Sequence, residues 1–555
     1  MTAIPERSFV PAQSSPQDLR PATNAATTLR TVAELTGARA LPSSVPVEDV
    51  QVTGIEQRSN AVRPGDLFAG LAGSQAHGAR FAHDAVERGA VAVFTDAAGA
   101  EVIGAIGVPV LVHDAPRSVL GELSSALYGD PSRKLRIIGI TGTSGKTTTS
   151  YLVETGLAAA GLRTALIGTI ETRIGGNRVP SALTTPEAPQ LHAMFALMVE
   201  QGVQAVVMEV SSHALALGRV DGVDFAVGAF TNLSQDHLDF HRDFEDYFAA
   251  KRRLFIPDDA ATAAHAGPSV AAHTAVICVD DQWGQRLAGD VSACLAGESG
   301  DTTGRLRTVA TRAGISADWR AGTALAGAGG TQEFTAAGPD VDVDVRLRLP
   351  GAYNVANGLL AVAVCAAAGV DASVAAAALA EVDVPGRMQR VDRGQDFLAV
   401  VDYAHKPAAI ESVVATLRTW ITNQGAGRLA VVVGAGGDRD AGKRPLMGAA
   451  AARGADLTII TDDNPRSEDP AVIRAAVLAG ADTVPGAERG EVREVGDRAA
   501  AIRTVVDWAQ PGDVVLIAGK GHETGQEIAG VKQPFDDREV LAAALSEKTR
   551  DLTHS

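Results

Sequence analysis

The sequence predicts an α/β protein with mostly parallel sheets, and three observations support this fold class. Short apolar runs rich in β-branched residues recur along the chain, and most lead into a glycine-rich or charged loop followed by a helical pattern. One such run, at 135–140, is followed directly by a glycine loop and a helical segment. A composition of 46% hydrophobic residues with only 4% aromatic residues fits the same class. With 555 residues the chain is too long for one core, so about two to four domains are expected.

Composition and charge exclude several classes of protein. A formal charge of −17 argues against broad binding of nucleic acid or of acidic membranes. No apolar run reaches membrane-spanning length, and the N-terminus lacks the apolar region of a signal peptide, so a membrane-embedded protein is not expected. Cys278, Cys294 and Cys365 lack metal-ligand spacing and are predicted to be buried, reduced thiols. These features together predict a cytoplasmic protein.

The N-terminal part predicts a disordered tail and a small α/β domain that by itself says little about function. Residues 1–27 are rich in Pro, Ser, Ala and Thr without periodicity, which is typical of a disordered segment. The domain that follows ends near Pro116. Its expected elements are a helix at 28–35, strands at 52–55 and 65–71, a helix at 80–89 and a strand at 90–94.

The stretch 141–149 has the form of a phosphate-binding loop. Gly142 and Gly145 allow backbone N–H groups to close on phosphate oxygens, and the N-terminus of the next helix adds partial positive charge. Lys146 would reach the β- and γ-phosphates, and the Thr147 hydroxyl would hold Mg²⁺. The usual pattern has a glycine five residues before Gly145, which is absent here, so the loop is a shorter variant. A plain glycine turn with an exposed lysine is the alternative.

Two residues near strand ends are candidate metal ligands. Glu209 interrupts the apolar run 205–210, where a buried carboxylate is costly unless it meets a cation. It either binds a metal or pairs with a lysine or arginine, and the nearby phosphate loop favours the metal. His237 lies in the polar loop after a third apolar run, 225–230, where a structural role and a metal-binding role both stay open.

The segment 243–255 predicts a helix whose apolar stripe contains a lysine. Lys251 lies seven residues after Phe244, on the stripe that Tyr247 and Phe248 extend. In one interpretation its ammonium extends to water along the apolar stem. In the other it is an interior lysine with a lowered pKa, able to react with CO₂ and form a carbamate suited to Mg²⁺.

The next part of the chain is less informative. Residues 258–340 are rich in Ala, Gly and Thr, and strands are expected at 276–279 and 341–349. Asn354 and Asn357 then stand three residues apart at the start of a long Ala/Val helix. They either cap this helix or contact a ligand.

A second parallel sheet is predicted in the C-terminal part, after residue 386. Helical patterns separate its apolar strands, and each strand leads into a polar, charged or glycine-rich loop. The expected strands begin at Ala399, Leu429, Leu457 and Val514. Because the carboxyl ends of parallel strands meet at one edge of a sheet, these loops are expected to bind a ligand there.

With these motifs in order, the chain resembles the Mur ligase family across nearly its whole length. The matching motifs are Gly142–Thr147, Met208–His213, Thr231–Leu233 with Asp236 and His237, Pro350–Asn357, Pro385–Arg387 and Asp402–His405. Four further motifs, at 184–186, 436–440, 463–466 and 519–523, are similar to one branch of the family in its actinobacterial form. That branch adds meso-diaminopimelate to UDP-N-acetylmuramoyl-L-alanyl-D-glutamate.

The resemblance implies three domains after the tail at 1–27. They are a UDP-sugar-binding domain at 28–115, a central P-loop ATP-binding domain at 116–385 and a Rossmann-like amino-acid-binding domain at 386–555. It also implies an ATP-dependent ligase of peptidoglycan synthesis, and so a role in cell-wall biogenesis, cell shape and cell division. ATP would convert the D-Glu γ-carboxylate into an acyl phosphate, from which the diaminopimelate amine displaces phosphate. A monomer is expected.

The resemblance further assigns roles around the phosphate loop. The catalytic residues would be Lys146, Glu209, His237, Lys251 and Arg387. Mg²⁺ would be held by Thr147, Glu209, His237 and the carbamate that CO₂ forms on Lys251. ATP would be bound by Gly142, Thr143, Ser144, Gly145, Lys146, Thr147, Thr148, Asn354 and Asp402.

Two further sets of residues are implied for the other substrates. The UDP-dipeptide would be bound by Ser59, Ser74, Gln75, Ala76, Thr184, Thr185, Ser211 and Arg219. Diaminopimelate would be bound by Arg439, Asp463, Asn464, Pro465, Arg466, Gly519 and Glu523. Arg466 is singled out because a two-pronged guanidinium suits the carboxylate that diaminopimelate has and lysine lacks. Two alternatives stay open: another ligase of the family, such as a lysine-adding one, or a non-catalytic nucleotide-gated binding protein.

Overall fold

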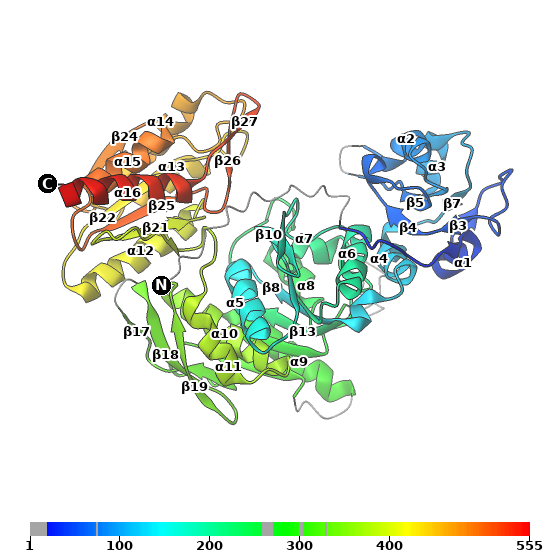
Figure 1. Ribbon diagram of the computed structural model, residues 1–555, viewed down its shortest axis with the longest axis horizontal. Helices are drawn as coiled ribbons and strands as arrows, with labels where there is room; N and C mark the ends of the chain where they lie inside the picture. Colours follow the sequence, from blue (N-terminus) through cyan, green and yellow to red (C-terminus); the bar gives the residue numbers. More distant parts are fainter. Residues whose placement is uncertain (1–18, 74–75, 258–269, 299–303, 328–329, 555) are drawn as a thin grey trace, which may run out of the picture. The chain divides into compact units, whose positions relative to one another are not determined.

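The chain folds into two units in which strands and helices alternate (Figure 1). The computed structural model describes residues 19–73, 76–257, 270–298, 304–327 and 330–554. The first unit comprises Met1–Ala310, Gly314–Asp318 and Leu360–Asp371, and the second comprises Thr311–Ala313, Trp319–Leu359 and Ala372–Ser555.

The first unit begins with a small five-stranded sheet in the order β2-β7-β6-β5-β4. Strands β4 to β7 are parallel and β2 is antiparallel, which matches the predicted α/β class. The strands are β2 Arg39–Ala40, β4 Gly54–Glu56, β5 Asp66–Ala69, β6 Ala92–Thr95 and β7 Val110–Val112, with β1 Thr27–Thr28 paired to β3 Gln51–Val52 outside this sheet. The helices are α1 Leu29–Thr36, α2 Ala82–Glu87, α3 Ala97–Ile103 and α4 Pro116–Leu127.

Part of the predicted disordered tail is ordered, which corrects the sequence-based expectation. Arg20 donates two hydrogen bonds to Asp66, at 2.7 and 2.5 Å, and the Asn24 amide donates to the carbonyl oxygens of Thr53 and Leu127. The composition of residues 1–27 does not reveal these contacts, because each contact joins two residues that are far apart in the chain. Residues 1–18 lie outside the described part.

A larger sheet forms the centre of the first unit, in the order β11-β10-β9-β12-β8-β13-β14-β15. The strands β9, β12, β8, β13, β14 and β15 are parallel to one another. Strand β10 is antiparallel to β9, and β11 is antiparallel to β10. Its strands are β8 Arg136–Thr141, β9 Thr164–Ile167, β10 Glu171–Ile174, β11 Asn177–Pro180, β12 Ala205–Glu209, β13 Phe225–Phe230, β14 Thr274–Cys278 and β15 Leu306–Ala310. The strand that leads into the phosphate loop, β8, therefore lies between the strands that lead to Glu209 and His237.

Helices pack against this sheet and bring the loop residues together. They are α5 Lys146–Ala159, α6 Ala188–Glu200, α7 Ser212–Ala216, α8 Phe244–Arg252 and α9 Gln282–Glu298. The predicted helix at 243–255 ends at Arg252, so Leu254 and Phe255 lie beyond it, although both are buried. The interior side of the sheet is filled by aliphatic and aromatic side chains, including Phe195, Phe225 and Phe230.

The second unit contains antiparallel strands and then a second mostly parallel sheet. The antiparallel strands are β16 Trp319–Ala321, β17 Leu325–Ala326, β18 Gln332–Ala337 and β19 Asp342–Leu347, followed by α10 Ala352–Ala367 and α11 Ala372–Ala378. Helix α10 crosses the boundary between the units.

The C-terminal sheet has the strand order β20-β21-β25-β22-β23-β24, with all strands parallel except β20. Its strands are β20 Gln389–Arg390, β21 Leu398–Asp402, β22 Leu429–Val433, β23 Leu457–Ile460, β24 Glu491–Glu494 and β25 Val514–Ala518, and β26 Gly525–Ile528 pairs with β27 Val531–Pro534. The helices are α12 Pro407–Gln424, α13 Lys443–Ala452, α14 Pro470–Asp482, α15 Arg498–Trp508 and α16 Asp537–His554. This confirms the predicted parallel sheet and places its loops at one edge.

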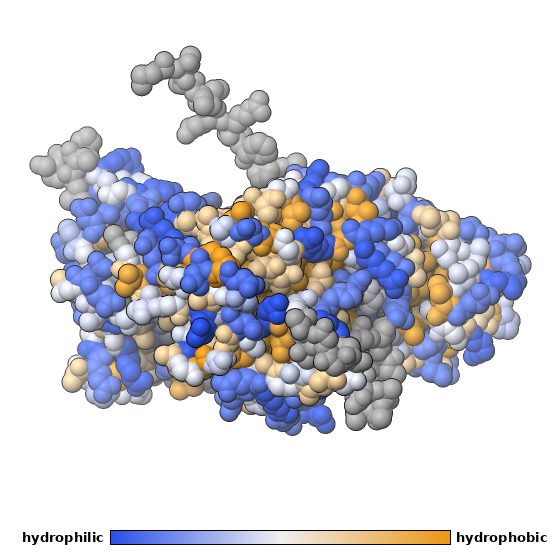
Figure 2. Space-filling model, turned by 90° about the horizontal axis from the view of Figure 1, so that it is seen from below, coloured by the Kyte–Doolittle hydropathy of each residue, from blue (hydrophilic) through white to orange (hydrophobic). Residues whose placement is uncertain are grey.

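Among the described residues, no helix is both long and apolar enough to span a membrane. Hydrophilic and apolar residues are interspersed on the face shown in Figure 2. Cys278 and Cys365 are buried, as expected, and burial raises the pKa of each thiol to about 12. Cys294 is only partly buried, which differs from the expectation.

Candidate active site

The phosphate loop has the geometry that its sequence predicts. It connects the end of β8 to the start of α5, and Gly142 and Gly145 both have positive φ, at 143° and 87°. Residues with a Cβ rarely adopt these angles, so glycine is needed at both positions. Lys146 begins the helix, and its Nζ donates to the carbonyl oxygens of Gly142 and Thr143, at 3.0 and 3.1 Å.

The rest of the loop is held by Asn232, which lies in the loop after β13. Asn232 accepts a hydrogen bond from Ser144 N on its side chain, at 3.0 Å, and one from Thr143 N on its backbone carbonyl, at 2.9 Å. Thr147 and Thr148 are buried in the first turn of α5. The loop is thus held open by the chain itself, with its backbone N–H groups at a helix N-terminus, where phosphate binds well.

Glu209 lies at the end of β12 with 1% of its surface exposed. Its carboxylate accepts hydrogen bonds from the Thr147 hydroxyl at 3.0 Å, and from the Thr169 hydroxyl at 3.0 Å and backbone N–H at 2.8 Å. Within the described part of the chain all of these donors are neutral, so the alternative of a lysine or arginine partner is not realised. A buried carboxylate joined to a P-loop hydroxyl offers oxygen ligands of the kind that Mg²⁺ prefers.

Lys251 is an interior lysine, with 1% of its surface exposed. The structure therefore excludes the interpretation in which its ammonium extends to water. Its Nζ lies 4.6 Å from the centre of the Tyr247 ring and donates to Gly142 O at 2.8 Å. Burial, with a smaller contribution from the nearby Lys146 charge, lowers the pKa of Lys251 well below its ordinary value. The lysine thus has the neutral, nucleophilic form available.

His237 lies in the loop after β13 and has a positive φ of 54°. Its ring centre is 4.8 Å from that of His213 and 6.1 Å from that of Tyr247, and its Nε2 lies 3.4 Å from Asp236 Oδ2. The contact with Tyr247 brings His237 to the ring that also covers Lys251. Among the described residues, no group of three or more His, Cys, Asp and Glu is placed to hold a metal ion.

Four of the residues expected to bind the UDP-dipeptide gather around the end of β12. Thr185 Oγ1 donates to Glu209 O at 2.8 Å and accepts from Ser211 N at 3.2 Å. Thr184 is bonded through its hydroxyl to Thr169, the residue that also holds the Glu209 carboxylate. Arg219 donates to Thr185 O and pairs with Glu187 at 2.8 Å. These side chains adjoin the candidate metal-binding carboxylate.

Of the remaining residues of that set, Ser59 and Ala76 lie outside the strands of the small N-terminal sheet. Ser59 begins a short 3₁₀ turn, and Ala76 accepts a hydrogen bond from Gly73 N at its carbonyl oxygen. Ser74 and Gln75 lie outside the described residues.

The second unit holds the other residues expected around ATP. Asn354 donates to Pro350 O at 2.7 Å and accepts from the Asn357 amide at 3.0 Å, so the pair ties the start of α10 to the loop before it. Asp402 accepts from the backbone N–H groups of Met388 and Ala404, and burial raises its pKa. The Arg387 guanidinium lies 4.5 Å from the centre of the Tyr403 ring.

The loops expected to bind diaminopimelate meet at the carboxyl edge of the C-terminal sheet. The Asn464 amide donates to Glu523 at 2.9 Å, although these residues follow different strands. Gly519 has a φ of 115°, and a Cβ there would lie 2.9 Å from the Asp463 carboxylate, so glycine is required by the close approach. Three of the predicted residues, Asp463, Asn464 and Glu523, thus form one polar cluster.

Arg466 lies on the other side of the same loop, with a positive φ of 54°. Its Nη1 donates to Gly437 O at 2.6 Å, and its Nε lies 3.6 Å from Glu527. The Pro465 carbonyl before it accepts from Glu468 N, and exposed Arg439 lies near Gly436, to which Arg466 is also close. The two arginines therefore lie at the same glycine-rich loop.

Several residues that the structure places at these sites were not predicted from the sequence. Thr169 holds Glu209, Tyr247 covers Lys251, and Lys520 lies inside the cluster formed by Asp463, Asn464 and Glu523. The feature that indicated Glu209 also applies to Thr169, because Thr169 is a polar residue just beyond the carboxyl end of an apolar strand. Lys520 is a charged residue between two glycines, and its sequence neighbours do not show that it is buried.

Comparison with known proteins adds independent evidence. Three family models match in order: "Mur ligase family, catalytic domain" at residues 51–128, "Mur ligase middle domain" at 140–365 and "Mur ligase, glutamate ligase domain" at 386–521. The chain is 52% identical to the UDP-N-acetylmuramoyl-L-alanyl-D-glutamate–2,6-diaminopimelate ligase of Corynebacterium efficiens, over 92% of this chain and 93% of the relative. It is 51% identical to the ligase of the same name from Streptomyces avermitilis, over 95% of this chain and 98% of the relative.

A solved structure extends the likeness to three dimensions. It is titled as a UDP-N-acetylmuramoyl-L-alanyl-D-glutamate–2,6-diaminopimelate ligase, shares 31% identity and has a TM-score of 0.66, covering 96% of this chain and 100% of that chain. Full-length relatives at half identity and a matching fold agree with the motifs of the phosphate loop and of the C-terminal sheet edge. This chain therefore belongs to the Mur ligase family.

Proposed function

We propose that this chain is the ligase that uses ATP to join meso-diaminopimelate to the D-Glu γ-carboxylate of UDP-N-acetylmuramoyl-L-alanyl-D-glutamate, in peptidoglycan synthesis. The observation that carries this proposal is identity of about half along nearly the full length of ligases that bear this name. The P-loop with its buried acid and buried lysine supports ATP-driven chemistry. The acid-rich and arginine-bearing cluster at the C-terminal sheet edge supports a substrate with both ammonium and carboxylate groups.

The reaction consists of two displacements. A γ-carboxylate oxygen of the dipeptide attacks the γ-phosphorus of ATP, the bond to the bridging oxygen breaks, and ADP leaves with its electron pair. The diaminopimelate amine then attacks the acyl carbon, loses a proton, and expels inorganic phosphate to form the amide. Lys146 and the backbone N–H groups of the phosphate loop would hold the transferred phosphoryl group in line and stabilise its charge. Arg387 would add positive charge to the phosphate oxygens.

We further propose that a divalent cation binds at the phosphate loop. Thr147, Glu209 and His237 would hold Mg²⁺, and a carbamate formed by CO₂ on Lys251 would hold a second ion. Supporting this, Glu209 is buried and, within the described part of the chain, bonded to neutral donors, and burial lowers the pKa of the Lys251 amine. Bound Mg²⁺ would neutralise phosphate charge as it develops.

The other substrate contacts are assigned as follows. The UDP-dipeptide is bound by Thr184, Thr185, Ser211 and Arg219 near the end of β12 and by Ser59, Ser74, Gln75 and Ala76 of the N-terminal part of the chain. Asn354 serves the adenine side of ATP and Asp402 its ribose. Diaminopimelate is bound by Arg439, Asp463, Asn464, Pro465, Arg466, Gly519 and Glu523. We also propose that the chain is a monomer and that it is cytoplasmic, and for the location the three free cysteines suit a reducing compartment.

The test is release of ADP with the UDP-dipeptide present, comparing meso-diaminopimelate with L-lysine. Wild type should prefer diaminopimelate strongly, because lysine would leave a site arginine without its carboxylate. Arg466→Ala should raise the KM for diaminopimelate by roughly 30- to several-thousand-fold, the scale of losing one partner of a desolvated charge pair. The KM values for ATP and the UDP-dipeptide should change little.

Two controls sharpen this experiment. Arg493→Ala removes an exposed arginine of β24, whose only described partner is Glu491 on the same strand, and should leave all three KM values unchanged. Equal kcat/KM for lysine and diaminopimelate in the wild type would overturn the assigned substrate. ATP hydrolysis or binding without amide formation would favour the binding-protein alternative.

A further inference from the structure

Lys520 is a lysine with no exposed surface at the edge of the C-terminal sheet. It lies between Gly519 and Gly521, whose φ angles are 115° and 52°, in the loop that leaves β25. Burying an ammonium costs free energy unless it is paired and hydrogen-bonded. Its partners therefore indicate what the residue does.

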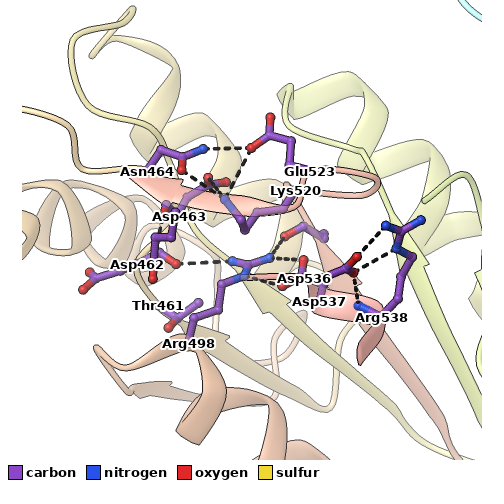
Figure 3. Close-up of polar contacts among 12 residues, drawn as sticks. Thr461, Asp462, Asp463, Asn464, Arg498, Lys520, Glu523, Asp536, Asp537 and Arg538 are labelled. Atoms are coloured by element: carbon purple, nitrogen blue, oxygen red, sulfur yellow. Dashed lines mark hydrogen bonds and ion pairs between the residues drawn. The ribbon is translucent and has the colours of Figure 1, made fainter. Parts of the chain in front are cut away.

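Among the described residues, the three acceptors around the Lys520 ammonium belong to the proposed diaminopimelate pocket. Nζ donates to Asn464 Oδ1 at 3.0 Å and lies 3.3 Å from Glu523 Oε2 and 3.6 Å from Asp463 Oδ1 (Figure 3). Glu523 keeps 34% of its side chain exposed, whereas Lys520 is enclosed. A ligand can therefore reach the carboxylate of Glu523 but not the ammonium behind it.

A second buried cation lies next to this cluster. Arg498 has 1% of its surface exposed and donates two hydrogen bonds to Asp537, both at 2.7 Å (Figure 3). Its remaining N–H groups donate to Ala518 O at 2.9 Å and to Asp462 O at 3.4 Å. These two carbonyls precede the loops that carry Lys520 and Asp463, so one guanidinium fixes the starting points of both loops.

The two cations act on the same acids. Burial alone would lower the pKa of Arg498, but the charge and hydrogen bonds of Asp537 raise it instead, with smaller contributions from Asp463 and Glu523. The carboxylates of the pocket thus face buried positive charge from Lys520 directly and from Arg498 at longer range. Asn464 is also fixed in orientation, because its oxygen accepts from Lys520 while its amide nitrogen donates to Glu523.

We propose that Lys520 is a positioning residue for the incoming amino acid, which presets Asn464 and Glu523 while Arg498 and Asp537 fix the loops that carry them. This inference rests on the proposed function of the pocket. Lys520 keeps two neighbouring carboxylates together with their oxygens aimed at one place. The ammonium and carboxylate of the amino acid then meet groups that are already ordered, which lowers the entropy cost of binding.

The first experiment compares Lys520→Met with Lys548→Met in steady-state assays of ADP release. Lys548 is a suitable control because it lies in the same unit and also donates to three acceptors, the carbonyl oxygens of Val506, Asp507 and Ala509 at the end of α15. Lys520→Met should raise the KM for meso-diaminopimelate about 10- to 100-fold, with kcat at saturation and the KM values for ATP and UDP-dipeptide within about threefold. Lys548→Met should change none of these constants by more than about twofold.

The second experiment uses two neighbouring aspartates and does not depend on how Lys520→Met folds. Asp537→Asn weakens the partner of Arg498, and Asp536→Asn weakens an equally two-pronged contact with Arg538, a residue that is not among the partners of Arg498 and Lys520 named above. Asp537→Asn should raise the KM for diaminopimelate about three- to tenfold, and Asp536→Asn should not raise it.

The outcomes separate this inference from the proposed function. If wild type releases no ADP in response to diaminopimelate, the proposed function fails. If wild type responds but Lys520→Met has the diaminopimelate KM of Lys548→Met, or if all three KM values rise together, the positioning role is refuted. Equal effects of Asp537→Asn and Asp536→Asn would refute the role of Arg498.

Discussion

Two lysines share one acceptor in the phosphate loop. The Nζ atoms of Lys146 and Lys251 both donate to Gly142 O, at 3.0 and 2.8 Å. The two positive charges repel, and burial disfavours charge on Lys251 further, so its neutral amine is stabilised. That amine is the form that adds CO₂, as the proposed carbamate requires.

Removing the amine should therefore remove a charge-stabilising group. Lys251→Ala should slow turnover by roughly 10²–10³, the scale of one electrostatic stabiliser in an active site. Added formate or acetate should restore part of the rate by supplying a carboxylate in place of the carbamate. The measurement is kcat with and without the added anion.

An exposed lysine provides the comparison. Lys134→Ala should behave as wild type with and without formate, since Lys134 lies on the surface of a 3₁₀ turn. Turnover by Lys251→Ala at the wild-type rate would show that no carbamate is needed.

At the scale of elements, the N-terminal segment 19–27 fastens parts of the first unit that are distant in sequence. Arg20 pairs with Asp66 of β5, and Asn24 bonds to carbonyl oxygens before β4 and at the end of α4. Ala22 N also donates to Glu200 at the end of α6, at 3.0 Å. Asp66 is 1% exposed, so its charge depends on Arg20 and on the backbone N–H of Arg63.

Loss of Arg20 should thus destabilise the first unit. Arg20→Met leaves a buried carboxylate without its cation, which costs about 3–5 kcal/mol. The free energy of unfolding from urea titration should fall accordingly. Arg30→Met is the matched control, because Arg30 pairs with Glu48 while both side chains are about half exposed, and such pairs contribute about 0–1 kcal/mol. Equal losses for the two variants would contradict a stapling role.

Some strands could be predicted from the sequence and others could not, depending on how each strand is buried. Strands β8, β12, β22 and β25 are buried on both faces, so their near-continuous apolar runs identify them. The hairpin of β10 and β11 has no such pattern. It is fixed by tertiary contacts, among them the Tyr151 hydroxyl on Glu171 at 3.0 Å and Arg173 on Glu154 at 2.9 Å.

Some residues of the candidate site could likewise be predicted from the sequence, and others could not. The glycines and Lys146 of the phosphate loop depend on local conformation, so the sequence predicts them. The burial of Lys251 and of Lys520 depends on which segments pack over them, and no local pattern distinguishes a buried lysine from an exposed one. Thr169 reaches Glu209 only because β9 lies beside β12 in the sheet.

At the scale of the whole molecule, one buried histidine predicts how stability depends on pH. His192 of α6 is fully buried, and its Nε2 is bonded to Asp221 O at 3.0 Å. Burial lowers its pKa to about 4, from an ordinary value near 6.5. Below pH 6.5 the unfolded chain therefore binds a proton that the folded chain does not, so stability is lost as pH falls from 6.5 toward 4.

Removing this histidine should weaken the acid sensitivity. His192→Gln keeps an N–H donor for Asp221 O but does not titrate. Lowering the pH from 8 to 5 should reduce the unfolding free energy of the wild type by about 2 kcal/mol more than that of the variant. Urea titrations at the two pH values measure it. A difference that is independent of pH would show that His192 is protonated equally in the folded and unfolded chain.

The shared carbonyl of Gly142 has one more consequence. An anion that draws Lys146 toward itself withdraws one of the two lysine N–H donors on that oxygen, and so changes the surroundings of the Lys251 amine. With the proposed carbamate on Lys251, nucleotide binding and CO₂ binding would be two ligations of a single coupled equilibrium. By reciprocity, whatever factor ATP imposes on the affinity for CO₂, CO₂ must impose on the affinity for ATP. Dissolved bicarbonate would thus act as an effector of nucleotide binding, at a loop built from six consecutive residues.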